Sequence, residues 1–168
     1  MMSFFIHGYY KGKVDFDYKA FDNINFPEID YETNDLNLSE YQQRTLGHIQ
    51  GQLENKIVQT FDNYELTERP GLWQNVTKEN NEFHNDYVYG DKFNSNILVY
   101  LDKGTEENDN YIEVKETNSA PHRIYPEVGE YMWLNQAPGF FHRANNGKGI
   151  RRVIHFAYYI PEIKKWNT

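Results

Sequence analysis

The sequence contains no cysteine among its 168 residues. A chain without cysteine has no disulfide framework and no thiolate nucleophile, and it cannot bind a metal through sulfur. Long apolar runs are missing as well, because no stretch approaches the roughly 20 apolar residues that a membrane-spanning helix needs. We therefore expect no membrane span, and we expect any transition metal to be bound by histidine, aspartate or glutamate.

Positive charge is scarce. Seventeen lysines and arginines stand against 25 aspartates and glutamates, which gives a formal net charge of -8. Nucleic acids and anionic membranes are bound by net basic surfaces, so this balance argues against both as partners. The N-terminal "MMSFFIHGYYKGK" lacks the cationic segment and the apolar run of a secretory signal, and we predict a cytoplasmic protein. A local anion site stays open because basic residues gather late in the sequence, at Arg143, Lys148, Arg151, Arg152, Lys164 and Lys165.

Aromatic residues, by contrast, are abundant, with 14 tyrosines, 11 phenylalanines and 3 tryptophans. Such side chains fit the half-buried surface of a β-sheet. The length suits one domain with a sizeable core. We predict a single domain over residues 1–168, with a helical and irregular lead-in over about 1–65 and a β-barrel core over about 70–160.

One helix is predicted in the lead-in. Residues 15–38 are acidic and asparagine-rich without clear periodicity, which indicates an irregular segment. Ser39 can then cap a first turn, and Gln42 can reach back to complete a capping box. Apolar residues follow at spacings of three and four, which is typical of one buried helix face. They are Leu46, Ile49, Leu53 and Ile57.

Short strands separated by turn residues are predicted after residue 60. The candidate strands are 71–76, 95–101, 110–115, 121–125, 130–135 and 150–160. The segments between them are rich in Asn, Gly, Pro and Asp, as strand connections are. Several short strands after one helix favour an antiparallel sandwich or barrel. We therefore predict a mainly β protein with a supporting N-terminal helix, folded as a double-stranded β-helix, the jelly roll of cupin-like proteins.

The stretch "EFHNDY" at residues 82–87 places a histidine and an aspartate two positions apart. Chance alone gives about one such pair in this composition (6 × 25/168), so the pair needs further support. Residues i and i+2 of a strand face the same side, so His84 and Asp86 can point at one metal ion. His142, 58 residues after His84, can supply a third ligand from across the barrel. Two histidines and one carboxylate form the facial triad of non-haem Fe(II) oxygenases.

Two arginines at the start of the last predicted strand are candidates for binding an anion. Arg152 lies ten residues after His142, and the strand face that contains it is otherwise apolar, with Ile154, Phe156 and Tyr158. We interpret this face as the barrel interior. A buried guanidinium needs an anionic partner, which a dicarboxylate co-substrate can provide through two hydrogen bonds. Arg151 is the alternative if the register differs by one residue.

The order of these residues resembles that of the Fe(II)- and 2-oxoglutarate-dependent oxygenases. Their pattern is His-x-Asp, a gap of some tens of residues, a second His, and an Arg or Lys about ten residues beyond. Here it reads "HND" at 84–86, His142 and Arg152. The segments "LWQNV", "NILVYLDKGT" and "IYPEVGEYMWLN" also resemble family strands, so the resemblance covers about residues 70–160. The Gly-Gly-x-hydrophobic segment of prolyl-hydroxylase-like members is absent, which leaves the subgroup open.

The resemblance implies that His84, Asp86 and His142 bind Fe(II) and that Arg152 binds the far carboxylate of 2-oxoglutarate. The protein would then be a dioxygenase that uses O2 to hydroxylate an unactivated C–H bond, with release of succinate and CO2. The carboxylate of Asp86 favours hydroxylation over halogenation, because halogenating members have a small residue there. The substrate stays open among a small molecule, an amino acid and a peptide side chain, and selectivity is expected from loops 103–110 and 117–121 and the N-terminal segment.

The sequence also leaves several assignments open. Candidates for a further co-substrate contact are Asn75, Asn96 and Tyr100. The histidines expected to be structural or exposed are His7, His122 and His155. A cupin-like binding or structural module without turnover is one alternative function, and a metal-dependent dioxygenase that needs no 2-oxoglutarate is another. Neither the oligomeric state nor the metal present in the isolated protein follows from the sequence.

Overall fold

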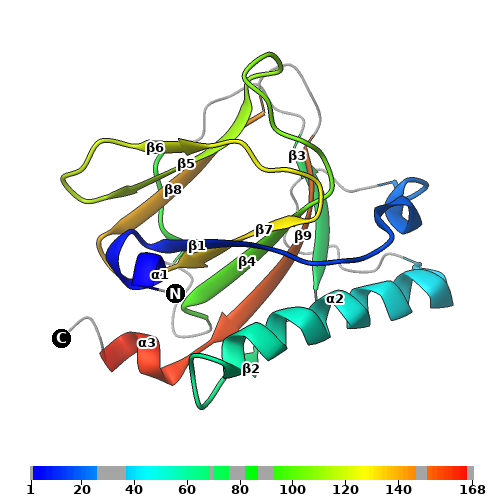
Figure 1. Ribbon diagram of the computed structural model, residues 1–168, viewed down its shortest axis with the longest axis horizontal. Coiled ribbons are helices and arrows are strands. Elements are labelled where there is room, and N and C mark those ends of the chain that lie inside the picture. The colour runs from blue at the N-terminus through cyan, green and yellow to red at the C-terminus, as the bar shows by residue number, and fades with distance from the viewer. Residues whose placement is uncertain are drawn as a thin grey trace.

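Two antiparallel sheets form the body of the protein (Figure 1). The computed structural model describes residues 2–25, 37–68, 70–75, 82–86, 93–146 and 151–165. The larger sheet contains β1 (Tyr9–Lys13), β2 (Glu65–Leu66), β3 (Gly71–Asn75), β4 (Ser95–Tyr100), β7 (Glu130–Asn135) and β9 (Arg151–Tyr159). The smaller sheet contains β5 (Asn110–Glu116), β6 (His122–Ile124) and β8 (Phe140–Asn146). The helices are α1 (Met2–Ile6), α2 (Glu40–Val58), α3 (Pro161–Lys165) and the 3-10 helix η1 (Tyr18–Phe21).

The strand order confirms the predicted double-stranded β-helix. The larger sheet runs β1-β7-β4-β9-β2, with β3 also paired to β9, and the smaller sheet runs β6-β5-β8. Each of the six predicted strand segments contains a strand, whereas β1, β2 and β8 were not predicted. The sequence of β1 has a glycine between two lysines, and β8 follows a Pro-Gly turn and carries several polar residues, so neither has the apolar pattern of a strand.

Helix α2 has the predicted start and the predicted buried face. Ser39 Oγ accepts a hydrogen bond from the Gln42 N–H at 3.3 Å, and Gln42 Oε1 accepts one from the Ser39 N–H at 2.8 Å, which completes the capping box. All four residues of the predicted stripe are buried. The irregular segment 15–38 contains η1, and its residues 26–36 lie outside the described part of the chain. Among the described residues, no helix has both the length and the apolar character to cross a membrane.

Two apolar layers lie on opposite faces of the larger sheet. On the outer face, α2 packs against Ile154 and Phe156 of β9. On the inner face, Val153 packs with Tyr100 and with Ile112 of the smaller sheet. The prediction that Arg152 and Ile154 face the barrel interior was therefore wrong, because α2 covers the face of β9 that contains Ile154. The alternate residues, which include Arg151 and Val153, face the interior. Both faces of β9 are buried, so apolarity alone did not distinguish them.

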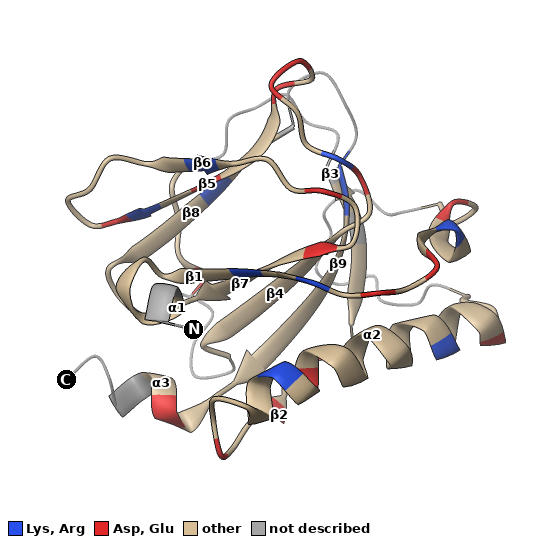
Figure 2. Ribbon diagram, viewed as in Figure 1, with Lys and Arg blue, Asp and Glu red and all other residues tan. Residues whose placement is uncertain are grey.

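The described arginines of the late basic group lie on different sheets, and Figure 2 shows Lys and Arg on β5, β6 and β8 of the smaller sheet. Arg143 on β8 pairs with the buried Glu113, with 2.5 Å between Nε and Oε2. Arg151 and Arg152 begin β9, and as neighbours in a strand they face opposite sides of the sheet. Lys148 and the side chains of Lys164 and Lys165 lie outside the described part.

Replacing Leu53 by alanine should destabilise the protein by about 2–5 kcal/mol, because the side chain is 1% exposed and its removal leaves a cavity between α2 and the larger sheet. Val58 on the same helix is 53% exposed, so Val58→Ala is the matched control and should change the free energy of unfolding by well under 1 kcal/mol. Urea unfolding followed by circular dichroism measures both. Equal effects for the two variants would contradict this packing of α2.

Candidate metal centre

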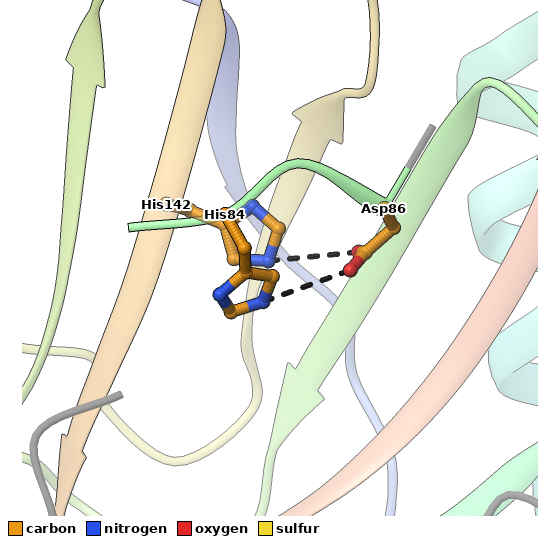
Figure 3. A group of neighbouring side chains, drawn as sticks. All are labelled: His84, Asp86 and His142. Carbon is orange, nitrogen blue, oxygen red and sulfur yellow. Dashed lines mark ion pairs between the residues drawn. The ribbon is translucent and has the colours of Figure 1, made fainter. Parts of the chain in front are cut away.

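Three side chains with metal-binding atoms, His84, Asp86 and His142, lie together between the two sheets (Figure 3). Each offers one ligand atom, and these atoms lie within 4.8 Å of one another. Nε2 of His84 is 3.6 Å from Oδ1 of Asp86, and Nε2 of His142 is 3.6 Å from Oδ2. The structure thus brings together the three ligands predicted from the sequence, which we call the candidate centre.

The backbone places the two histidines opposite each other. The N–H of His84 donates to the carbonyl of His142 at 3.0 Å, and the N–H of His142 donates back at 2.9 Å. The segment before Asp86 therefore lies along β8 as an added edge of the smaller sheet, with the two rings 4.4 Å apart. Nδ1 of His84 is 2.9 Å from the carbonyl oxygen of Glu82, and a proton on Nδ1 leaves Nε2 free to bind a metal.

Asp86 is held at its carboxylate by the larger sheet and at its backbone by the turn that follows β7. Nδ2 of Asn96 on β4 donates to Oδ2 of Asp86 at 2.7 Å. The Asp86 N–H donates to Oε1 of Gln136 at 3.0 Å, and Gln136 is fully buried. Asn96 was predicted as a possible co-substrate contact, and the structure instead places its amide on the aspartate. Hydrogen bonds of this kind orient a ligand before a metal arrives.

The three residues differ in burial. The side chains of His84, Asp86 and His142 are 44%, 15% and 11% exposed. Burial lowers the pKa of His142 to about 4, the nearby Asp86 carboxylate acts in the opposite direction, and the charge of Arg151 adds to the lowering. His142 is therefore neutral at pH 7, which is the form that binds a metal.

Arg151 faces the same interior as the candidate centre. Its side chain is almost fully buried, and its charge lowers the pKa of His142. Within the described part of the chain, neither its Nε nor one of its terminal nitrogens has a hydrogen-bond partner, and the same holds for the hydroxyl of Tyr100. The Arg151 guanidinium lies 6.0 Å from the centre of the Tyr100 ring. A buried cation and a buried hydroxyl without partners are costly unless a ligand supplies them.

Arg152 lies on the outer face of the larger sheet, away from the candidate centre. Its guanidinium and its backbone N–H both donate to the Asp102 carboxylate, at distances from 2.7 to 3.2 Å. Asp22 lies 3.6 Å from another of its nitrogens. The hydrogen bond with Asp102 raises the pKa of Arg152. The structure therefore gives Arg152 protein carboxylates as partners and does not bring it to the three ligands.

The other histidines differ in their surroundings. His7 is exposed and lies 3.4 Å from Glu116, and His122 is exposed and stacks on Tyr9. His155 is buried on the inner face of β9, where burial lowers its pKa to about 4, with Asp86 acting against this and His142 adding to it. Its ring thus lies near the candidate centre, which the sequence did not indicate because the register of β9 was misjudged. Asn75 lies in β3, and its side chain is outside the described part.

Comparison with known proteins identifies the fold. No protein-family model matches the sequence, and no curated protein matches it. A prolyl hydroxylase from Trichoplax adhaerens, in complex with a peptide fragment of the hypoxia inducible factor oxygen degradation domain, has a TM-score of 0.72 at 11% identity, with 99% of this chain and 90% of that chain covered. HygX from Streptomyces hygroscopicus, with nickel and 2-oxoglutarate bound, has a TM-score of 0.66 at 13% identity, with 95% and 85% covered. A prolyl-4-hydroxylase from Pseudomonas putida has a TM-score of 0.59 at 12% identity, with 95% and 90% covered.

These likenesses confirm the fold predicted from the resemblance. The chain has the double-stranded β-helix of the prolyl hydroxylases and other 2-oxoglutarate- and Fe(II)-dependent oxygenases. At 11% to 13% identity the likeness extends to the fold alone, and the matching structures come from more than one subgroup.

The two buried imidazoles should make the metal-free protein sensitive to mild acid. The pKa values of His142 and His155 are about 4 in the folded chain and about 6.5 in an unfolded one, so between these values the unfolded chain binds protons that the folded chain does not. The free energy of unfolding should therefore fall as the pH is lowered from 6.5 to 5, by up to about 1.4 kcal/mol per pH unit for each imidazole.

Urea unfolding of the chelator-treated protein at several pH values measures this dependence. His155→Asn removes one of the two imidazoles, so its stability should fall less steeply with acid than that of the wild type. Identical slopes for the two proteins would show that His155 is not held neutral in the fold.

Proposed function

We propose that this protein is an Fe(II)- and 2-oxoglutarate-dependent dioxygenase that hydroxylates an unactivated C–H bond. The observation that carries the proposal is the pairing of two features in one interior: three metal-binding side chains with ligand atoms within 4.8 Å, and a buried arginine, Arg151, whose Nε and one terminal nitrogen have no hydrogen-bond partner among the described residues. Two imidazoles and one carboxylate suit Fe(II), and they leave coordination positions open for other ligands. The fold, which is that of 2-oxoglutarate-dependent oxygenases, supports the same function.

His84, Asp86 and His142 would hold the iron in this proposal. Iron, 2-oxoglutarate and O2 together supply the oxidising chemistry, in which one oxygen atom enters succinate with loss of CO2 and the other enters the substrate C–H bond. The chain itself binds and orients these groups. Neutral His142 needs no deprotonation to bind the metal, and the amide of Asn96 holds one oxygen of Asp86 while the other stays directed toward His84.

Arg151, rather than Arg152, is the residue we propose to bind the far carboxylate of 2-oxoglutarate. Arg152 already binds the Asp102 carboxylate, whereas Arg151 has donors without partners in the described part of the chain. The hydroxyl of Tyr100, close to Arg151, can donate to the same carboxylate. This assignment follows the alternative register that the sequence left open, and it gives the buried cation the anion that its burial demands.

A groove of about 580 Å³ at the Phe140 end of β8 is where we place the substrate. It is bordered by Phe140, which lies two residues before His142 on the same face of β8, a separation of roughly 7 Å along a strand. Other lining residues are Phe5, Ile6, Glu116, Thr117 and Ser119. The N-terminal segment and the hairpin at 117–119 thus both line it, as expected for elements that select the substrate. A peptide side chain suits such an open groove, and the Trichoplax prolyl hydroxylase was solved with a peptide.

An anaerobic titration with Fe(II) and then 2-oxoglutarate tests the proposal through the weak visible charge-transfer band of the chelate. The wild type should give the band, and His142→Ala should lose it. Arg151→Ala should need about 10- to 100-fold more 2-oxoglutarate, because a hydrogen-bonded charge is removed from the site. Arg152→Ala is the matched control, and it should need no more 2-oxoglutarate than the wild type.

Each other outcome has a distinct meaning. A band that depends on Arg152 and not on Arg151 would show that Arg152 binds the far carboxylate of 2-oxoglutarate, as first predicted. A metal site whose band depends on neither arginine would indicate a dioxygenase that does not use 2-oxoglutarate in this way. Absence of metal binding in the wild type would contradict the enzyme and favour a cupin-like binding module.

Replacing Asn96 by alanine should weaken metal binding about 10- to 100-fold, because Asp86 loses the hydrogen bond that orients it. Asn108→Ala is the control, since among the described residues that side chain bonds within the loop from Lys103 to Asn110. Isothermal titration with Ni(II) measures both affinities. Equal affinities for the two variants would show that Asn96 does not orient the ligand.

A further inference from the structure

We infer that Asn85, the residue between the two ligands of the "HND" motif, positions the metal centre by binding the turn that leads into the strand of the third ligand. This inference rests on the proposed function. Asn85 does not point at the centre, because its amide nitrogen makes its hydrogen bonds to backbone oxygens of another segment. It therefore acts through its neighbours and not on the metal.

The groups around the amide nitrogen of Asn85 are hydrogen-bond acceptors. Its Nδ2 lies 3.1 Å from the carbonyl oxygen of Gln136, 3.0 Å from that of Ala137 and 3.0 Å from that of Phe140. An asparagine amide has two N–H groups to share among these three acceptors. An aspartate of the same size would place a carboxylate oxygen against the same carbonyl oxygens, and an alanine would leave them without this partner.

Two of the carbonyl groups that Asn85 binds, those of Gln136 and Ala137, belong to the turn between β7 and β8, and the third is that of Phe140, the first residue of β8. His142 follows two residues later on the same strand. A second link reaches the same turn, because the Asp86 N–H donates to the side chain of Gln136. One turn is thus joined to Asn85 through its backbone and to Asp86 through a buried side chain.

The hydrogen bonds of Asn85 and Asp86 to this turn fix the position of Asp86, which the backbone hydrogen bonds between His84 and His142 leave open. That pair sets His84 against His142, but Asp86 lies beyond it, where its place depends on side-chain contacts. The Asn85 amide holds the chain between His84 and Asp86 against the turn, so it sets how far the carboxylate stands from both imidazoles. A loss of this amide should change metal binding in a protein that is still folded.

Titration with Co(II), followed by its visible d–d absorption, tests this role without turnover. Asn85→Asp and Asn85→Ala should bind Co(II) about 10- to 100-fold more weakly than the wild type, with a shifted or weakened d–d spectrum. Asn145→Ala is the matched control for Asn85→Ala. Asn145 is buried on β8, three residues after His142, and its amide donates to Asp109 at 3.0 Å. That variant also loses an amide donor, but it should bind Co(II) with the affinity and spectrum of the wild type.

Circular dichroism of the metal-free variants separates positioning from folding. Asn85 variants that fold and bind Co(II) as the wild type does would overturn the inference and leave the proposed function standing. Asn85 variants that fail to fold without metal, while Asn145→Ala folds, would also overturn it, because the amide would then serve the fold. Failure of the wild type to bind Co(II) more tightly than His142→Ala would contradict the proposed function itself.

Discussion

The pair of backbone hydrogen bonds between His84 and His142 is the contact on which the candidate centre depends. It attaches a short segment to the edge of the smaller sheet, and residues that face each other in such a pair carry their side chains on one side. Both imidazoles therefore reach the space between the sheets. Asp86 follows two residues later, and Asn96 on the opposite sheet meets its carboxylate. The candidate centre thus adds a polar link between the two sheets, whose inner faces also pack through apolar side chains.

Arg151 and Arg152, the first two residues of β9, lie on opposite faces of the larger sheet and have different surroundings. Arg152 is on the outside, where Asp102 and Asp22 neutralise it and link β9 to the elements around it. Arg151 is on the inside, where burial lowers its pKa and no described acceptor meets its Nε. The first arrangement stabilises the fold, whereas the second costs free energy until an anion is bound. One step along a strand thus separates an arginine paired with protein carboxylates from the arginine that we propose binds an anion.

Much of the fold and of the candidate site could be predicted because it depends on residues that lie close together in the sequence or in a recognisable order along it. The capping box at Ser39 acts within one turn of helix, and the order of His84, Asp86 and His142 matches a pattern that a sequence displays directly. The face of β9 could not be predicted, because its two sides are buried against different partners and only tertiary packing distinguishes α2 from the smaller sheet. The amide of Asn85 was missed for a related reason, since its three acceptors are backbone oxygens more than 50 residues away.

Because the three ligands differ in burial, one side of the candidate centre faces the barrel interior and the other side faces solvent. His142 is packed in the barrel, while nearly half of the His84 side chain is in contact with solvent. A metal held here would be approached by water, chelators and competing ions from the His84 side. Ligand affinity by itself does not select iron among the divalent metals. The metal found in a purified sample would then depend on the solutions used in purification, and not only on the metal that the protein bound in the cell.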